Sequence, residues 1–149
     1  MSVWPELYEL GSEIDFSETS NSSQYALTGW GHPEPWGRWT VGALAELCLP
    51  LDRPLGPRAK FEAVVVPYVR GRHRPLNVEI YFGQHLVRKL AFSVSGRRKV
   101  RVAIPATLCE KETQVRIGIR ILNPQSPLSL GRSNDARPLG LGFMWAWLK

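Results

Sequence analysis

Residues 76–92 read LNVEIYFGQHLVRKLAF, and this stretch decides the fold. Polar and apolar side chains alternate over 76–82, and 85–92 is a second run rich in apolar residues after Gly83-Gln84, a pair suited to a tight turn. Alternation with a period of two puts one set of side chains on a core and the other on solvent. The stretch therefore predicts an antiparallel hairpin with strands over 76–82 and 85–92.

Runs of the same kind recur along the rest of the chain and end at Gly, Pro or turns such as Ser95-Gly96. The expected strands cover 59–69, 98–104, 113–122 and 139–148, and earlier 12–17, 25–30 and 39–51, the last of which also fits a short helix. One helical turn is expected, over 106–111. Eight or nine short strands at this spacing predict an all-β fold, a two-sheet antiparallel β-sandwich or jelly roll.

The size and composition of the chain fit one domain over residues 1–149, because 44% of the 149 residues are hydrophobic and 21% are charged. The N-terminus lacks the pattern of a signal peptide, and no apolar run is long enough to span a membrane. We expect a cytoplasmic protein or a piece of a larger one. Cys48 and Cys109 lack the spacing of zinc or redox motifs and are expected to be reduced, buried thiols.

A net charge of +6 indicates an acidic partner. Arg97, Lys99 and Arg101, however, alternate with Val100 and Val102, which is typical of the solvated face of a strand. Few aromatic residues lie among the basic ones, so nucleic acid is not expected as a partner.

Residues 29–42, GWGHPEPWGRWTVG, hold three tryptophans among glycines and prolines. Indole rings on a stiff loop suit stacking on a sugar, although packing in the core is the plainer alternative. Trp36 and Trp39 are three residues apart and would point to opposite faces of an extended chain. One of them is therefore expected to face solvent or a cleft.

The last strand alternates strongly, with Leu139, Leu141, Phe143, Trp145 and Trp147 on one face. The other face is also largely apolar, which indicates a central strand covered on both sides or one that meets a partner domain. From this pattern Leu141, Phe143 and Trp145 are predicted to lie in the core.

Two motifs together resemble a known family. The first comprises Gly29, Trp30, Pro33, Glu34, Trp36, Gly37, Trp39 and Gly42; the second comprises Asp135, Arg137, Leu139, Gly140 and Leu141. They resemble a β-sandwich module found beside glycosyltransferase domains in bacterial surface-polysaccharide proteins. The resemblance implies a non-catalytic accessory domain suspected of binding carbohydrate, with a glycosyltransferase domain as partner. None is attached here, so the chain is expected to be either an excised module or a free-standing one.

Glu34 and Arg137 are charges set in glycine-rich, apolar surroundings. They are expected to meet as a bidentate pair, either as a structural salt bridge or as sugar-contacting groups. In a glycan site, indole rings would stack on a sugar while polar groups bond its hydroxyls. The candidate ligand-binding residues are Trp36, Trp39, Glu34, His32, Asn134, Asp135 and Arg137.

Catalysis has little support, because the carboxylates are scattered and the histidines lack the spacing of metal ligands. Glu13, Asp15 and Glu18 near the N-terminus can be considered as calcium ligands, but neither a metal nor a cofactor is expected. The sequence thus predicts a non-catalytic carbohydrate-binding module whose partner is a glycan, an anionic one included. The alternative is a protein-docking β-sandwich that binds a glycosyltransferase or forms a homo-oligomer.

Overall fold

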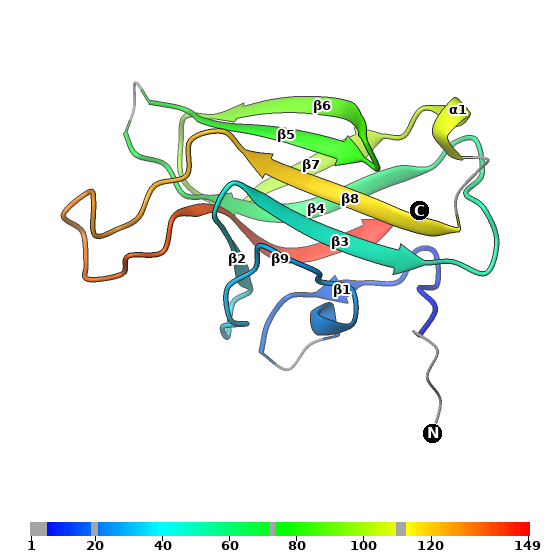
Figure 1. Ribbon diagram of the computed structural model, residues 1–149, viewed down its shortest axis with the longest axis horizontal. Coiled ribbons are helices and arrows are strands. Elements are labelled where there is room, and N and C mark those ends of the chain that lie inside the picture. The colour runs from blue at the N-terminus through cyan, green and yellow to red at the C-terminus, as the bar shows by residue number, and fades with distance from the viewer. Residues whose placement is uncertain (1–5, 19–20, 72–73, 110–112) are drawn as a thin grey trace.

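The computed structural model describes residues 6–18, 21–71, 74–109 and 113–149, which form two antiparallel sheets packed face to face (Figure 1). Sheet A contains β1 (Ile14–Asp15), β2 (Arg38–Val41), β4 (Lys60–Pro67), β7 (Arg98–Ala103) and β9 (Leu139–Leu148). Sheet B contains β3 (Leu44–Pro50), β5 (Leu76–Phe82), β6 (His85–Phe92) and β8 (Gln114–Ile121). The predicted all-β sandwich is confirmed.

The last strand, β9, organises sheet A. One edge of β9 pairs with β4, which in turn pairs with β7. The other edge pairs with β1 near its C-terminal end and with β2 near its N-terminal end. In sheet B the strand order is β3-β8-β5-β6.

The core lies between the sheets and is filled by alternate residues of the strands, as the period of two predicts. In β5, for example, Val78 and Ile80 are buried while Glu79 and Tyr81 are partly exposed. The largest fully buried side chains are Phe16, Phe61, Phe143, Ile14, Leu47, Leu49, Leu76, Ile117, Ile119, Ile121, Leu141 and Leu148.

A bulge in β9 reverses which of its residues face the core. Val64 of β4 pairs with Trp145 and the next residue, Val65, pairs with Phe143, so Met144 is an extra residue in β9. One extra residue moves every later side chain to the opposite face. The prediction that Trp145 lies in the core is therefore wrong, since it is half-buried on the outer face of sheet A.

After this bulge, Ala146 and Leu148 enter the core while Trp147 joins Trp145 on the outer face. Before it, Leu141 and Phe143 are buried as predicted. The last strand is thus central and apolar on both faces, but its core side changes once along its length.

The N-terminal third departs from the predicted strands. Residues 12–17 contain only the short β1, and 25–30 contain isolated bridges at Ala26 and Trp30 after a 3-10 turn, η1 (Ser22–Gln24). Residues 39–51 are split between β2 and β3, because the chain bends at Gly42, whose φ is +87°.

The expected helical turn is present as α1 (Ala106–Cys109); residues 110–112 lie outside the described residues. Cys109 is buried in α1 as predicted, but the prediction that Cys48 is buried is wrong: it lies between the buried Leu47 and Leu49 on β3, faces the other side of the strand and is half-buried. No helix among the described residues is both long and apolar enough to cross a membrane.

The basic stripe on β7 lies as predicted. Val100 and Val102 are buried in the core, and Lys99 and Arg101 are exposed on the other face of the strand.

Candidate functional site

Residues 29–42 fold back on themselves as a hairpin. Its arms are joined by hydrogen bonds from the Val41 amide to the Gly29 carbonyl (2.7 Å) and from the Gly31 amide to the Trp39 carbonyl (2.9 Å). At the tip, the amides and carbonyls of Glu34 and Gly37 bond each other at 2.7 and 3.2 Å. Proline 35 suits the second position of such a turn because its φ is fixed.

Trp30, on the first arm of the hairpin, is half-buried and packs against the core. Its ring lies 5.2 Å from that of Phe16 and 5.3 Å from that of Phe143, measured between centroids. Its indole Nε1 donates a hydrogen bond to the Glu46 carbonyl at 2.9 Å. For this tryptophan the core alternative is correct.

Trp36 and Trp39 lie on the same face, not on opposite faces as predicted. Their ring centroids are 5.0 Å apart with an interplanar angle of 69°. The prediction is wrong because it assumed an extended chain, whereas Trp36 lies in the turn between Glu34 and Gly37. Trp39 pairs with Gly142 of β9, and the Trp36 ring lies over that same glycine.

Tyr68 and Arg132 complete this group, and sequence reasoning did not include them. The Tyr68 ring is 5.7 Å from the Trp39 ring, edge to face, and the Arg132 guanidinium is 5.3 Å from the Tyr68 ring centroid. Arg132 also donates to the Val69 and Arg70 carbonyls at 3.0 and 3.1 Å. We call Trp36, Trp39, Tyr68 and Arg132 the aromatic cluster.

Tyr68 could have been found from the sequence, because it continues the outward-facing alternation of Glu62, Val64 and Val66. Arg132 carries no such signal, since it reaches β4 from a long loop. The hydroxyl of Tyr68 is buried and has no hydrogen-bond partner among the described residues. Buried polar atoms in folded proteins usually have a hydrogen-bond partner, which is often an ordered water.

Arg137 forms its bidentate pair with Asp135, not with Glu34 as predicted. Its Nε and Nη2 donate to the Asp135 carboxylate at 3.0 and 2.8 Å, and its amide donates to Oδ1 at 3.0 Å. These hydrogen bonds lower the pKa of Asp135 to about 2 and raise that of Arg137. Asp135 and Arg137 are two residues apart and can pair within their own loop. Arg137 therefore does not need Glu34, which is distant in the sequence, as its partner.

Glu34 is close enough to Arg137 for its charge to contribute to the raised pKa of that guanidinium. No salt bridge joins the two side chains. Instead, Glu34 Oε2 is buried without a hydrogen-bond partner among the described residues. It is a second buried polar atom of the same kind as the Tyr68 hydroxyl.

The hairpin and the Asp135–Arg137 pair are in contact at Gly31. A Cβ on Gly31 would lie 3.0 Å from Arg137 Nη1 and 3.3 Å from Val41 Cγ2. Arg137 thus occupies the space left by the missing side chain, next to the arm that carries Trp39. His32 and Asn134 are exposed beside these two groups, and the structure gives their side chains no hydrogen bond to a described residue.

The expected calcium candidates do not converge. Among the described residues, no group of three His, Cys, Asp or Glu side chains is placed to hold a metal ion. Asp15 accepts a hydrogen bond from the Ser17 amide at 2.8 Å, while Glu13 and Glu18 are exposed.

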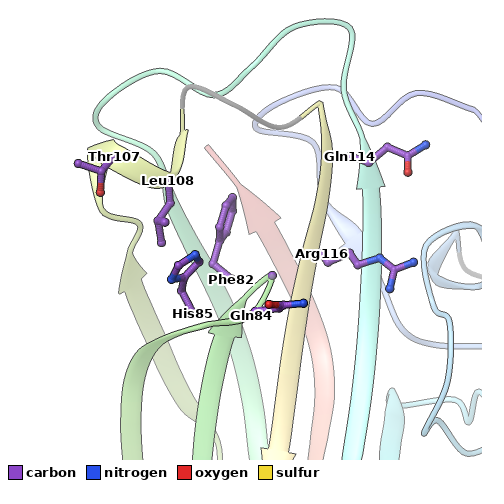
Figure 2. Close-up of a pocket in the computed structure, with 8 residues that line it drawn as sticks. Phe82, Gln84, His85, Thr107, Leu108, Gln114 and Arg116 are labelled. Carbon is purple, nitrogen blue, oxygen red and sulfur yellow. The ribbon is translucent and has the colours of Figure 1, made fainter.

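A separate pocket of about 600 Å³ lies at the other end of the molecule, between the β5–β6 turn and α1 (Figures 1 and 2). Figure 2 shows Phe82, His85 and Leu108 gathered on one side of it. The remaining lining residues are Gly83, Gln84, Thr107, Gln114 and Arg116. None of the predicted site residues lies here.

The structure defines the chain as a two-sheet antiparallel β-sandwich, with a half-buried aromatic cluster on the outer face of one sheet. Among solved structures, it is similar to carbohydrate-binding module CBM36 in complex with calcium and xylotriose (TM-score 0.52, 9% identity, 93% of this chain and 99% of that one). It is also similar to the CBM36-1 domain of a multidomain xylanase from the hindgut metagenome of Trinervitermes trinervoides (TM-score 0.50, 8% identity, 93% and 97%).

A third similar structure is dimeric latent PorU from Porphyromonas gingivalis (TM-score 0.55, 8% identity), in which the likeness covers 99% of this chain but 13% of that one. At these identities the similarity establishes the fold alone. No protein-family model matches the chain, and no curated protein matches it.

Proposed function

We propose that this protein is a non-catalytic module that recognises a glycan through the aromatic cluster. The observation that carries the proposal is the chain of rings from Trp36 through Trp39 to Tyr68, with centroid distances of 5.0 and 5.7 Å. The rings are half-buried on the outer face of sheet A, so part of each indole stays available to a ligand. Preorganised aromatic surfaces bind sugars without a large loss of side-chain entropy.

Polar groups beside the rings supply directional contacts. Arg137 and Asp135 fix each other's orientation, while the hydroxyl of Tyr68 and Oε2 of Glu34 are buried polar atoms without a described partner. A sugar hydroxyl both donates and accepts hydrogen bonds and is therefore suited to the side chains of Asp135 and Arg137, which are 29% and 36% exposed. His32 and Asn134 would lie at the rim. The fold shared with the CBM36 modules supports this proposal.

The proposal also covers the biological role of the module, its compartment and its partner enzyme. The motif resemblance to modules that accompany bacterial glycosyltransferases supports a role in surface-polysaccharide biosynthesis, in the cytoplasm and beside a glycosyltransferase. The rival function is a protein-docking surface for such an enzyme or for a second copy of this chain. The observation that favours the rival is that four of the five described tryptophans share one sheet face.

A glycan array with the wild-type module and with Trp36→Ala and Trp39→Ala tests the function. We expect wild-type affinities in the micromolar to millimolar range, because a shallow site buries little ligand area, and roughly tenfold losses in the variants. The proposal fails if no glycan binds, or if both variants bind as the wild type does.

A further inference from the structure

The outer face of sheet A continues well beyond the aromatic cluster, as the strand register shows. Trp147 of β9 lies in one row with Glu62 of β4 and Arg101 of β7. The following row places Trp145 beside Val64, with Lys99 on the far side. Directly opposed residues of antiparallel strands point to the same side of the sheet, so these residues share the face of the cluster.

The rows follow one another along β4 at a spacing of about 7 Å, because a strand rises about 3.4 Å per residue. Glu62, Val64, Val66 and Tyr68 mark four successive rows. Trp147 and Trp145 occupy the first two, and Trp39 with Gly142 occupies the third. Indole rings therefore extend along the whole strand instead of ending at the hairpin.

Cationic side chains border this line of rings. The Arg97 guanidinium lies 5.8 Å from the Trp145 ring centroid, and Arg132 lies over Tyr68. Lys99 and Arg101 are exposed on β7. A guanidinium that lies over an aromatic ring keeps N–H donors at its edge that can bond an anion.

The one buried carboxylate on the face is already compensated. Glu62 is 4% exposed, and its oxygens lie 3.9, 3.4 and 3.5 Å from the ammonium groups of Lys60, Lys99 and Lys149. Burial raises the pKa of Glu62, but the hydrogen bonds and charges of Lys99 and Lys149 outweigh burial and lower it overall. Three lysines around one carboxylate leave a surplus of positive charge.

Over the whole face, cations outnumber carboxylates. The outward carboxylates on β1, β4, β7 and β9 are Asp15 and Glu62; counted with the flanking segments, Glu13 precedes β1 and Glu34 lies in the hairpin turn that carries Trp36. The cationic side chains on or over the same face are Lys60, Arg97, Lys99, Arg101, Arg132 and Lys149.

From this arrangement we infer that the outer face of sheet A binds an extended acidic polysaccharide along β9, with Trp145 and Trp147 under successive sugars and the β7 cations beside their anionic groups. The inference rests on the proposed function and deepens it by naming the ligand class. Anionic groups in a polysaccharide are carboxylates of uronic acids or sulfates, and both complement this charge. A partner protein would instead cover the tryptophans and exclude water from them.

The test uses the whole chain and three probes: polygalacturonate for carboxylate, dextran sulfate for sulfate, and unmodified dextran as the neutral polymer. Affinity electrophoresis at low and at physiological salt gives the affinities. The variants are Lys99→Gln with Arg101→Gln, and separately Trp145→Ala; the matched control is Lys89→Gln with Arg116→Gln on exposed positions of sheet B.

We expect an acidic polymer to bind more tightly than dextran. The double variant Lys99→Gln with Arg101→Gln should lower that affinity about tenfold, while the control double variant should leave it unchanged. Trp145→Ala should weaken the same binding, with circular dichroism showing an intact fold. The stronger of the two acidic probes identifies the anionic group.

The inference would be overturned if the sheet A and sheet B double variants lost affinity equally, or if neither acidic polymer bound more tightly than dextran. If the charge variants bind as the wild type does while Trp36→Ala abolishes binding of a neutral glycan, the inference fails and the proposed function stands. Self-association lost on Trp145→Ala, without polysaccharide binding, would overturn both in favour of a protein interface.

Discussion

Trp36 lies directly over Gly142: a Cβ built on this glycine would come within 2.5 Å of Trp36 Cη2. The hairpin can place its tip ring on β9 only because residue 142 has no side chain. The same arrangement puts Trp36 beside Trp39, which pairs with Gly142 across the strands. The aromatic cluster therefore depends on one glycine of the last strand.

Gly142→Ala should displace the Trp36 ring and weaken glycan binding. Gly142 does not have a positive φ, so the backbone accepts alanine and the conflict is chiefly with the Trp36 ring, while Trp39 Cε3 would lie 3.2 Å from the added Cβ. We expect a loss of about 1–3 kcal/mol in the free energy of unfolding, as is usual for overpacking. Glycan titration and chemical denaturation measure the two effects.

Gly118→Ala is the matched control, because it is a buried glycine of a central strand in the other sheet. Its added Cβ would lie 3.4 Å from Tyr81 Cβ, an ordinary contact distance. It should leave binding unchanged. If Gly142→Ala also binds like the wild type, Trp36 is not a contact residue.

Trp39→Ala should destabilise the protein more than Trp36→Ala does. The Trp39 ring contacts both the Trp36 ring and the Tyr68 ring. The Trp36 ring contacts that of Trp39 but not that of Tyr68. We expect a difference of about 1 kcal/mol, the size of one aromatic pair. Urea denaturation of both variants would show it, and an equal or opposite ranking would argue against the ring order described.

Arg137 should be energetically coupled to Asp135 more strongly than to Glu34. The first pair shares hydrogen bonds of 2.8–3.1 Å, and the second shares none. Double-mutant cycles with Asp135→Asn, Glu34→Gln and Arg137→Gln measure both couplings through the free energy of unfolding. A larger coupling to Glu34 would restore the pairing expected from the sequence.

The stabilising effect of Asp135 should disappear in acid. Its pKa is lowered from 3.8 to about 2 in the folded protein, chiefly by the hydrogen bonds from Arg137. A depressed pKa stabilises the fold at pH values above the unfolded pKa, and this contribution is lost as the pH falls through the folded one. Wild type and Asp135→Asn should therefore differ by a constant amount above about pH 5.

Between about pH 4 and pH 2 the difference in the free energy of unfolding between the two proteins should shrink. Protonation removes the negative charge of Asp135 in the wild type, and the Asp135→Asn variant has no such charge at any pH. Chemical denaturation at a series of pH values gives the comparison. A difference that does not vary with pH would show that Asp135 is not ionically paired.

The sequence predicted the positions of most strands, but it did not predict on which face of the sheet the tryptophans lie. Alternation predicted β5 and β7 because each of these strands buries one face, whereas β6 is mostly exposed and was predicted from its composition and from the turn at Gly83-Gln84. The same rule misplaced Trp145, since the extra residue Met144 reverses the alternation in β9. Nothing local in the sequence marks that bulge.

The candidate site was predicted only in part, because the positions of its side chains also depend on features that the local sequence does not show. The hairpin and its rings follow from glycine and proline chemistry, but whether Trp36 and Trp39 share a face depends on where the turn begins. Tyr68 and Arg132 join the cluster through contacts distant in sequence, which only the packing of β4 and the 122–138 segment determines.

Nuclear magnetic resonance of the indole N–H groups during titration with oligosaccharides shows whether a glycan rests on the rings of the aromatic cluster. The signals of Trp36 and Trp39 should shift in a saturable way. That of Trp30, which donates to the Glu46 carbonyl inside the fold, should stay in place. If Trp36 and Trp39 do not respond to any neutral or acidic oligosaccharide while light scattering reports a dimer that covers them, the account is contradicted.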